Sequence, residues 1–405
     1  MKEIAGNTYI RQDNEDIFID SYHLHELIDL FDTPLMIFIE NRIRDNIRDF
    51  NDVFGNIFET YEGFYSLKAN YLPSICNIIS SERMGGEIIS LPELKVALNA
   101  GFSPERIIVG GPYLPDDLIE ISLKHSIKEL IIYNLEDLER VQEIAEKHHI
   151  IQNICLRINS MKYESKLGIK ITDTNANRIE TAFSKCSNLK FTTLLSHYGT
   201  QMNHVNQFLE NLDTIINAIK ILKKHGIEIK RINIGGGFPE ATVMPKKQLI
   251  RIAKALNASL QNKDINIEKI YVEPGRYIVG DSGIFIANVI KIAKNRWVFL
   301  NIGNHICPKF ARCSLRFYNV SKIDASHKYK TNLAGIIPTD QDVLAKDYFF
   351  TEQVELYDKV LVTNVGAYCL TFSNRFPYRL PTIINIKGDE YEEIFNPANQ
   401  HDFSI

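Results

Sequence analysis

Five short segments of this chain carry side chains that can do chemistry, and most of them directly follow an apolar run. They contain Lys68, His197, the glycines at 235–237, Glu273 and Tyr368. A lysine amine can form a Schiff base, an imidazole can face an aromatic ring, and glycine N–H groups can approach a phosphate closely. A carboxylate can keep a pyridine nitrogen protonated, and a tyrosine can add a hydroxyl. Together these groups predict a site for pyridoxal 5'-phosphate.

Each segment also has an ordinary structural explanation. A lysine that ends a strand often extends its ammonium group into water, and a glycine triplet is often only a turn. Glu273 could serve only as an ion-pair partner of Arg276, and His197 could be a core histidine. Each signal is weak alone, but their combination at successive strand ends favours the cofactor site.

The elements that must position these residues follow a regular alternation. Between about 35 and 285, short apolar runs alternate with amphipathic stretches typical of helices. The runs are 64–67, 87–90, 107–109, 130–133, 154–158, 192–197, 231–234 and 269–272. Eight strand–helix alternations predict an α/β fold, a (β/α)8 TIM-type barrel. Because the carboxyl ends of barrel strands meet at one mouth, the chemical residues should converge there.

Beyond 285 the pattern changes to β-rich runs without regular helices. These runs are 284–293, 296–302, 312–320, 332–337, 358–364 and 382–386. They predict a C-terminal, mainly antiparallel β domain. The expected domains are therefore a barrel at 35–285 and a β-rich domain at 286–405. The apolar stretch at 8–19 has no place in the barrel, so residues 1–34 are candidates to join the second domain.

Composition narrows the class of partner. The chain has 405 residues, 45% of them hydrophobic, and a formal net charge of -4. No block of Lys or Arg favours nucleic acid or an anionic membrane, so a small-molecule partner is expected. The six cysteines form no CxxC pair or zinc-like cluster with histidines, so we expect free thiols and no metal. No apolar signal segment or spanning stretch is apparent, and the predicted location is cytoplasmic.

The motifs resemble those of the alanine-racemase-like (fold type III) enzymes that use pyridoxal phosphate. The resemblance runs from about 35 to 380 and is to the diaminopimelate, ornithine and arginine decarboxylase group. It implies that Lys68 forms the Schiff base, His197 stacks on the cofactor ring and Glu273 contacts the pyridine nitrogen. The other cofactor-binding residues that it implies are Arg157, Thr200, Gly235, Gly236, Gly237, Gly275, Arg276 and Tyr368. It also implies a homodimer with active sites at the subunit interface.

One segment departs from the family pattern. In that group, Gly-Pro-x-Cys-(Asp/Glu)-x-x-Asp supplies a cysteine that protonates the decarboxylated carbon and an acid that holds the distal amine of the substrate. Residues 335–342 here read Gly-Ile-Ile-Pro-Thr-Asp-Gln-Asp. Pro338 stands at the cysteine position and Thr339 at the acid position, while Asp342 is retained. The proton donor and the distal contact are therefore open.

Two interpretations fit these substitutions. In the first, the protein is a decarboxylase of an atypical amino acid or amino-acid-derived intermediate, in polyamine, siderophore or other natural-product biosynthesis. Candidates for substrate recognition are then Asp342, Arg312, Arg316 and Tyr113, and candidates for protonation are Cys307, Cys313, Cys369, Asp340 and water. In the second, the protein is a racemase, another enzyme acting at Cα, or a cofactor-binding protein without decarboxylation. Retention of Lys68 and Glu273 favours the first, since racemases of this superfamily usually place arginine at the pyridine nitrogen.

Overall fold

The computed structural model describes residues 1–159, 165–308 and 315–401, and these residues form two compact units. One unit comprises Ile47–Pro239 and Met244–Gly275. The other comprises Met1–Asn46, Glu240–Val243 and Arg276–Ile405, of which the last four residues lie outside the described part. We refer to them as the barrel unit and the β unit. Each is described separately.

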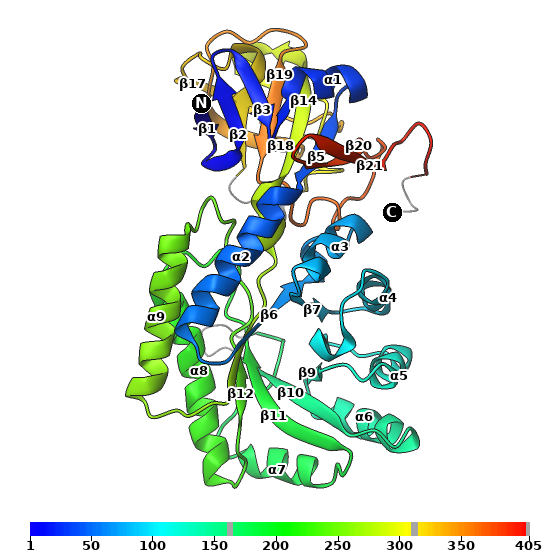
Figure 1. The fold of residues 1–405 in the computed structure, drawn as a ribbon, viewed down its shortest axis with the longest axis vertical. Helices are drawn as coiled ribbons and strands as arrows, with labels where there is room; N and C mark the ends of the chain where they lie inside the picture. The colour runs from blue at the N-terminus through cyan, green and yellow to red at the C-terminus, as the bar shows by residue number, and fades with distance from the viewer. Residues whose placement is uncertain (160–164, 309–314, 402–405) are drawn as a thin grey trace. The chain divides into compact units, whose positions relative to one another are not determined.

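The barrel unit contains a closed ring of parallel strands in the order β10-β11-β12-β13-β6-β7-β8-β9. Figure 1 labels several of them, among them β6 and β11. Strands such as β8 and β9 are buried along their whole length, as expected for apolar strands covered on both faces. The strands are β6 (Tyr61–Ser66), β7 (Gly85–Ile88), β8 (Ile107–Gly110), β9 (Glu129–Ile132), β10 (Gln152–Ile158), β11 (Leu189–Ser196), β12 (Arg231–Asn233) and β13 (Lys269–Val272). The predicted TIM-type barrel is confirmed.

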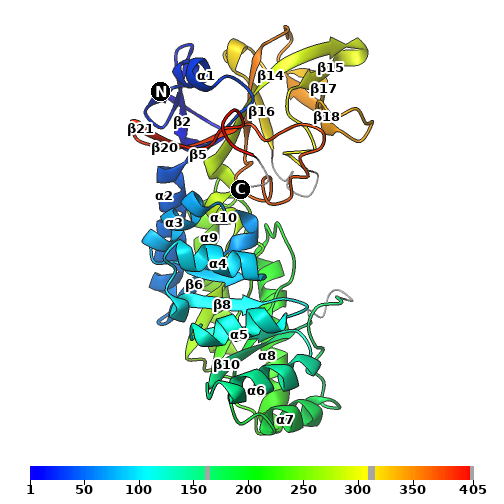
Figure 2. The same cartoon turned by 90° about the vertical axis from the view of Figure 1, so that its right-hand side faces the viewer.

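Helices follow the strands and cover the outside of the barrel, as Figure 2 shows for α4, α5 and α6. Their starts have local causes: Ser90 caps α4 by accepting a hydrogen bond from the Glu93 amide at 3.4 Å, and Pro73 begins α3. The helices are α2 (Glu40–Ile57), α3 (Pro73–Ser81), α4 (Leu91–Asn99), α5 (Asp116–Lys124), α6 (Glu136–Lys147), α7 (Ala176–Ser184), α8 (Val205–Lys224) and α9 (Lys246–Asn262). α2 crosses the boundary between the two units.

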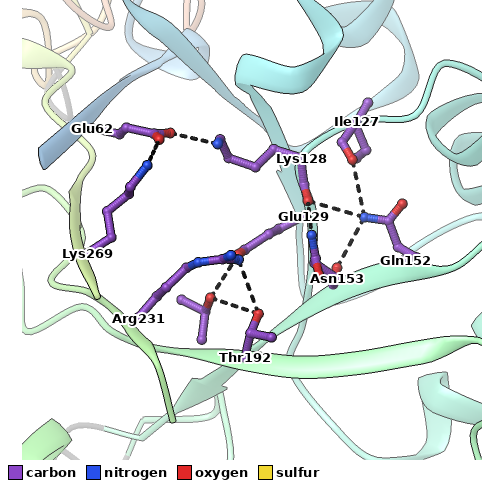
Figure 3. Close-up of polar contacts among 10 residues, drawn as sticks. Glu62, Ile127, Lys128, Glu129, Gln152, Asn153, Thr192, Arg231 and Lys269 are labelled. Atoms are coloured by element: carbon purple, nitrogen blue, oxygen red, sulfur yellow. Dashed lines mark hydrogen bonds and ion pairs between the residues drawn. The ribbon is translucent and has the colours of Figure 1, made fainter. Parts of the chain in front are cut away.

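Ion pairs occupy the amino ends of the barrel strands (Figure 3). Glu62 on β6 is paired with Lys128, at 2.8 Å, and with Lys269. Glu129 on β9, which is 1% exposed, is paired with Arg231 at 3.0 Å. Above this layer, apolar side chains from six strands fill the interior; they are Phe64, Ile108, Ile131, Cys155, Leu195 and Tyr271. Only the carboxyl end is therefore left for chemistry, as is usual in this fold.

Strand β7 differs from the expected position by two residues. The run 87–90 is predicted from sequence, but the strand is Gly85–Ile88, in register with Ser66↔Glu87. Ser90 caps a helix and does not end the strand. Glycine is needed at the first position of β7 because a Cβ at Gly85 would lie 2.6 Å from Phe64 Cδ1. The shift brings Glu87 to the mouth of the barrel.

The β unit contains two sheets. A four-stranded antiparallel sheet has the order β1-β2-β3-β4, and a nine-stranded sheet includes β18-β17-β15-β14-β5-β20-β21 with β16 and β19 attached. The first sheet consists of β1 (Lys2–Ile4), β2 (Asn7–Asp13), β3 (Asp16–Ile19) and β4 (Tyr22–His23). The strands of the second are β5 (Leu35–Ile39), β14 (Gly283–Ala293), β15 (Trp297–Leu300), β16 (Arg316–Asn319), β17 (Tyr329–Ala334), β18 (Val343–Phe350), β19 (Lys359–Thr363), β20 (Thr382–Lys387) and β21 (Glu390–Phe395). The mainly antiparallel second domain is thus also confirmed.

The units divide the chain at other places than 35 and 285. β5 pairs with β14 and β20, so residues 35–39 extend the β unit although they precede the first barrel strand. Helix α1 (Leu24–Phe31) and the 8–19 stretch also belong to the β unit, where the latter forms β2 and β3 of the smaller sheet. No helix among the described residues is long and apolar enough to cross a membrane.

Candidate active site

The lysine predicted to bind the cofactor follows β6 in a short 3-10 turn, Leu67–Ala69. Lys68 Nζ donates a hydrogen bond to Ser66 Oγ at 2.7 Å and forms an ion pair with Glu87. The Lys68 side chain is 37% exposed, whereas that of Glu87 is 5% exposed. The amine is therefore held at the base of the mouth by a buried carboxylate and still open to an incoming molecule.

Glu273 follows β13 and is also buried at the mouth. Its carboxylate accepts a hydrogen bond from Asn233 Nδ2 at 2.7 Å, and its backbone N–H donates to the Gly235 carbonyl at 2.9 Å. Burial and the negative charge of Glu87 raise the pKa of Glu273 to about 7, against the opposing effects of Lys68 and Asn233. This carboxyl group can thus hold or release a proton near neutral pH.

The pKa of Glu87 is shifted in the opposite direction to that of Glu273. Burial favours its neutral form, but the charge and hydrogen bond of Lys68 outweigh this, and the pKa of Glu87 is lowered. A hydrogen bond from Ser66 acts in the same direction. The carboxylate therefore stays ionised beside Lys68. Sequence reasoning missed Glu87 because it placed the end of β7 at Ser90; the Gly-Gly before Glu87 was the available signal.

His197 follows β11 and is held as a neutral imidazole. Its Nδ1 accepts a hydrogen bond from the Gly236 amide at 3.2 Å. Burial, with the positive charges of Arg157 and Lys68, lowers the pKa of His197 to about 3. The ring can therefore face an aromatic cofactor without adding a positive charge.

The glycines at 235–237 form a turn that other side chains would not fit. A Cβ at Gly235, where φ is +67°, would lie 2.8 Å from His197 Nδ1. A Cβ at Gly236 would meet the Glu273 carbonyl oxygen, and one at Gly237, where φ is +92°, would meet the Gly199 carbonyl. The turn is fixed by Asn233 Oδ1, which accepts from the Gly235 amide at 2.9 Å. The local geometry therefore requires glycine and brings backbone amides to the mouth.

These features fit a phosphorylated pyridine cofactor. The mouth combines an accessible amine, a neutral imidazole, a carboxyl group able to hold a proton and a glycine turn, which is the donor set that such a cofactor uses. Two buried polar atoms next to these residues, Ser196 Oγ and Gln201 Nε2, have no hydrogen-bond partner among the described residues. Thr200, expected near the phosphate, is exposed.

Arg157 on β10 contacts Tyr133, which follows β9. Its Nη1 donates to the Tyr133 hydroxyl at 2.7 Å. The 165–169 run returns beside Arg157, since the Ile169 amide donates to the Arg157 carbonyl at 3.0 Å. Gly168, with φ of +86°, permits this approach, because a Cβ there would lie 2.8 Å from the Arg157 oxygen. Gly275 is similarly close, with its Cβ position 3.1 Å from Ser66 Cβ.

Two residues expected to bind the cofactor lie in the β unit. The Arg276 guanidinium lies over the Tyr368 ring, 4.8 Å from its centroid, and its Nη1 is 3.3 Å from Glu240 Oε1. Arg276 is 5% exposed and Glu240 is fully buried. The cofactor contacts of Arg276 and Tyr368 remain predictions.

Three of the residues expected to recognise substrate are among the described ones, two in the β unit and one in the barrel unit. Asp342 is 2% exposed, and its carboxylate oxygens accept from the Asn304 and Ile337 amides, both at 2.7 Å. Arg316 Nη1 donates to the Ala5 carbonyl at 3.2 Å. Tyr113 lies in the barrel unit and is 63% exposed. Arg312 lies outside the described residues.

The candidate proton donors differ in exposure. Cys307 and Cys369 are buried free thiols, and Asp340 is exposed. Cys313 lies outside the described residues. The structure does not single out any of the described groups as the proton donor.

The chain is similar to known decarboxylases. Residues 40–280 match the model of the family described as "Pyridoxal-dependent decarboxylase, pyridoxal binding domain". The diaminopimelate decarboxylase of Aquifex aeolicus is 24% identical over 397 residues, covering 92% of this chain and 91% of that protein. The L-glutamyl-[BtrI acyl-carrier protein] decarboxylase of Niallia circulans is 26% identical over 407 residues, covering 93% and 94%. The crystal structure of diaminopimelate decarboxylase from M. jannaschii with L-lysine has a TM-score of 0.86 at 21% identity, covering 96% and 95%.

Proposed function

The chain belongs to the family of pyridoxal-dependent decarboxylases, and we propose that its substrate is an amino acid, or an amino-acid-derived intermediate, whose distal end carries no free amine. The family confirms three predictions from sequence: the cofactor, the decarboxylase class and the resemblance to the diaminopimelate decarboxylase group. The enzyme is a pyridoxal-phosphate-dependent amino-acid decarboxylase. The roles below and the choice of substrate are proposals.

The arrangement of Lys68, Glu87 and Glu273 at one mouth is the observation that supports these roles best. When bound, pyridoxal phosphate supplies an electron sink for the electron pair left on Cα as CO2 departs. Lys68 provides the amine that holds the cofactor covalently, and Glu87 holds the Lys68 ammonium when that amine is released. Glu273 keeps a proton at the pyridine nitrogen. His197, as a neutral ring, supports the cofactor face without competing for that proton.

Residues 335–342 favour a substrate without a free distal amine. Thr339 stands where the resemblance places an acid for such an amine, and a hydroxyl offers no charge to pair with it. The remaining acid of the motif, Asp342, already accepts two backbone amides at 2.7 Å. Breaking these bonds would leave two partly buried amides unpaired, so Asp342 is better explained as a support of its loop. A glutamyl group, as named for the Niallia circulans relative, has no free distal amine and agrees with the loss of this acid.

The runner-up is a diamino acid, because several relatives are diaminopimelate decarboxylases. The test is CO2 release by the purified enzyme from diaminopimelate, lysine, glutamate and a glutamyl thioester of N-acetylcysteamine. We expect the glutamyl compounds to have the highest kcat/KM. A higher kcat/KM for a diamino acid would overturn the substrate proposal and leave the decarboxylase class intact. Exchange of the Cα proton without CO2 release would instead indicate a racemase.

A homodimer with active sites at the interface is a further proposal, supported by the family resemblance alone. Sedimentation of the active enzyme is the test, and an active monomer would contradict it. Cytoplasmic location likewise remains a proposal, to be checked by cell fractionation.

A further inference from the structure

Three metal-ligating side chains meet at the start of the β unit, and the cofactor chemistry does not account for them. Asp16, His23 and His25 each offer one ligand atom, and these atoms all lie within 4.8 Å of one another. No metal is predicted from the cysteines, because they form no CxxC pair and no zinc-like cluster with histidines. A His-x-His pair with an aspartate on the preceding strand is a different signal.

The hairpin explains why these residues meet. Asp16 opens β3, His23 ends β4, and the two strands pair with Phe18 opposite His23. Alternate residues of a strand share a face, so Asp16 lies on the same face as Phe18 and diagonally across from His23. His25 follows in the first turn of α1. The arrangement therefore comes from a tight strand–strand–helix connection.

The His23 ring is packed but not saturated with hydrogen bonds. Its centroid lies 4.2 Å from that of Phe18 and 5.2 Å from that of His25. Its Nδ1 is buried and has no hydrogen-bond partner in the described part of the chain. His23 precedes α1 but its side chain caps none of the helix amides. Metal binding at this ring would thus break no bond at Nδ1.

We propose that Asp16, His23 and His25 bind a divalent transition-metal ion such as Zn²⁺. Two imidazoles and one carboxylate suit Zn²⁺, while Mg²⁺ and Ca²⁺ prefer oxygen ligands alone. Ligand atoms on one tetrahedral zinc lie about 3.4 Å apart, so small rotations of the exposed Asp16 and His25 side chains close the site. Water completes the coordination. Asp13, paired with Asp16 across the hairpin, and Glu26 beside His25 add negative charge that attracts a cation.

A bound ion would join β3 to the connection between β4 and α1. Because binding to the folded state alone stabilises it, Zn²⁺ should raise the unfolding temperature of the protein. The proposal does not depend on the substrate or on the decarboxylation, since the three residues and their test lie apart from catalysis.

Titration of the full-length holoenzyme with ZnCl2, by isothermal calorimetry, tests the site. Wild type should bind one Zn²⁺ per chain at this site and show no such binding of Mg²⁺. Replacing a ligand, in His25→Ala or Asp16→Asn, should weaken binding about tenfold or more. The matched controls are His125→Ala and Asp264→Asn, which remove an exposed histidine and an exposed aspartate of the barrel unit. The controls should bind Zn²⁺ as wild type does.

Cobalt(II) gives a second readout, because its visible absorption reports the ligands. A spectrum of nitrogen and oxygen coordination that disappears in His25→Ala supports the site. A thiolate band, equal Zn²⁺ affinity in ligand and control variants, or no Zn²⁺ binding to wild type would each overturn it. All four substitutions are at exposed positions, so circular dichroism should show native folding in each.

Discussion

The two ends of the barrel bury the same kinds of side chain but balance their charges differently. At the amino end, Glu62 and Glu129 are matched by two lysines and an arginine (Figure 3). At the carboxyl end, Lys68 is ion-paired with Glu87, and Glu273 accepts a hydrogen bond from a neutral asparagine amide. Both acids at the amino end are thus ion-paired, whereas Glu273 at the carboxyl end is hydrogen-bonded to a neutral group.

The pKa shifts depend on burial and on the partners of each carboxyl group. At the amino end, Lys128 and Lys269 lower the pKa of Glu62 against the effect of burial. Burial raises the pKa of Glu129, although Thr193 and Arg231 oppose it. At the carboxyl end, burial and Glu87 raise the pKa of Glu273 to about 7. Glu62, which is paired with two lysines, and Glu273, which is not paired with a cation in the described part of the chain, are therefore opposite cases at the two ends, and Glu273 can keep a proton available. The following experiments test this difference.

The largest expected effect is that of Lys68→Ala. Because the amine that holds the cofactor is lost, kcat should fall about 10⁴-fold or more. Borohydride reduction and mass mapping should find the cofactor on Lys68 in wild type and on no residue in the variant. The matched control at the amino end is Lys269→Ala, which should keep kcat within about twofold. Full turnover by Lys68→Ala without an added amine would remove Lys68 from the mechanism.

Glu273→Gln should lower the rate less than Lys68→Ala. A glutamine carries no negative charge to stabilise a proton on the pyridine nitrogen, so kcat should fall about 10²- to 10³-fold. The absorbance of the bound cofactor should remain, because Lys68 is intact. Glu62→Gln is the control from the amino end, and its kcat should be near that of wild type. Unchanged kinetics in Glu273→Gln would mean that another group serves the nitrogen.

Substitutions at the amino end of the barrel should lower the stability of the protein and leave kcat unchanged. Glu129→Ala removes the carboxylate oxygen that accepts hydrogen bonds from Arg231 Nη1 at 3.0 Å and from Thr193 Oγ1 at 2.8 Å. The free energy of unfolding, from urea titration, should fall by about 2–4 kcal/mol, with kcat unchanged. Glu268→Ala, which breaks an exposed pair with Lys230, is the control and should cost less than about 1 kcal/mol. An equal loss of unfolding free energy in both variants would contradict a structural role for the buried ion pair at the amino end.

Sequence patterns predicted those parts of the molecule that depend on local chemistry. The eight barrel strands were found because each is a short apolar run, and the glycine turn because positive φ angles require glycine. The register of β7 was missed by two residues, since Gly-Gly-Glu-Ile does not read as a strand until Phe64 packs against the glycines. Glu87 was missed with it.

Long-range pairing accounts for most of the remaining differences. β18 and β21 were not predicted, because their half-exposed sequences are strands only beside β17 and β20. β5 was assigned to the barrel region by its place in the chain, yet its partners β14 and β20 come far later. The metal-ligating cluster also needs the hairpin register before its three residues can be recognised. Such features are set by the partner strand and not by the segment itself.

The smallest effect, and the most direct test of the comparison, is the pH dependence of stability of the cofactor-free protein. Since the pKa of Glu273 is raised from 4.5 to about 7, the folded state binds the extra proton and loses stability as pH rises through that range. Glu273→Gln removes this loss and should stabilise the protein at pH 8 by about 1–2 kcal/mol, with little gain near pH 4.5. Glu62 has a lowered pKa, so its contribution is present above its unfolded pKa, and Glu62→Gln should destabilise the protein at pH 8. Urea titrations at both pH values measure the two differences. Opposite signs at pH 8 would show that the ion-paired Glu62 supports folding while the buried Glu273 is kept at a cost in stability, whereas equal signs would contradict that difference.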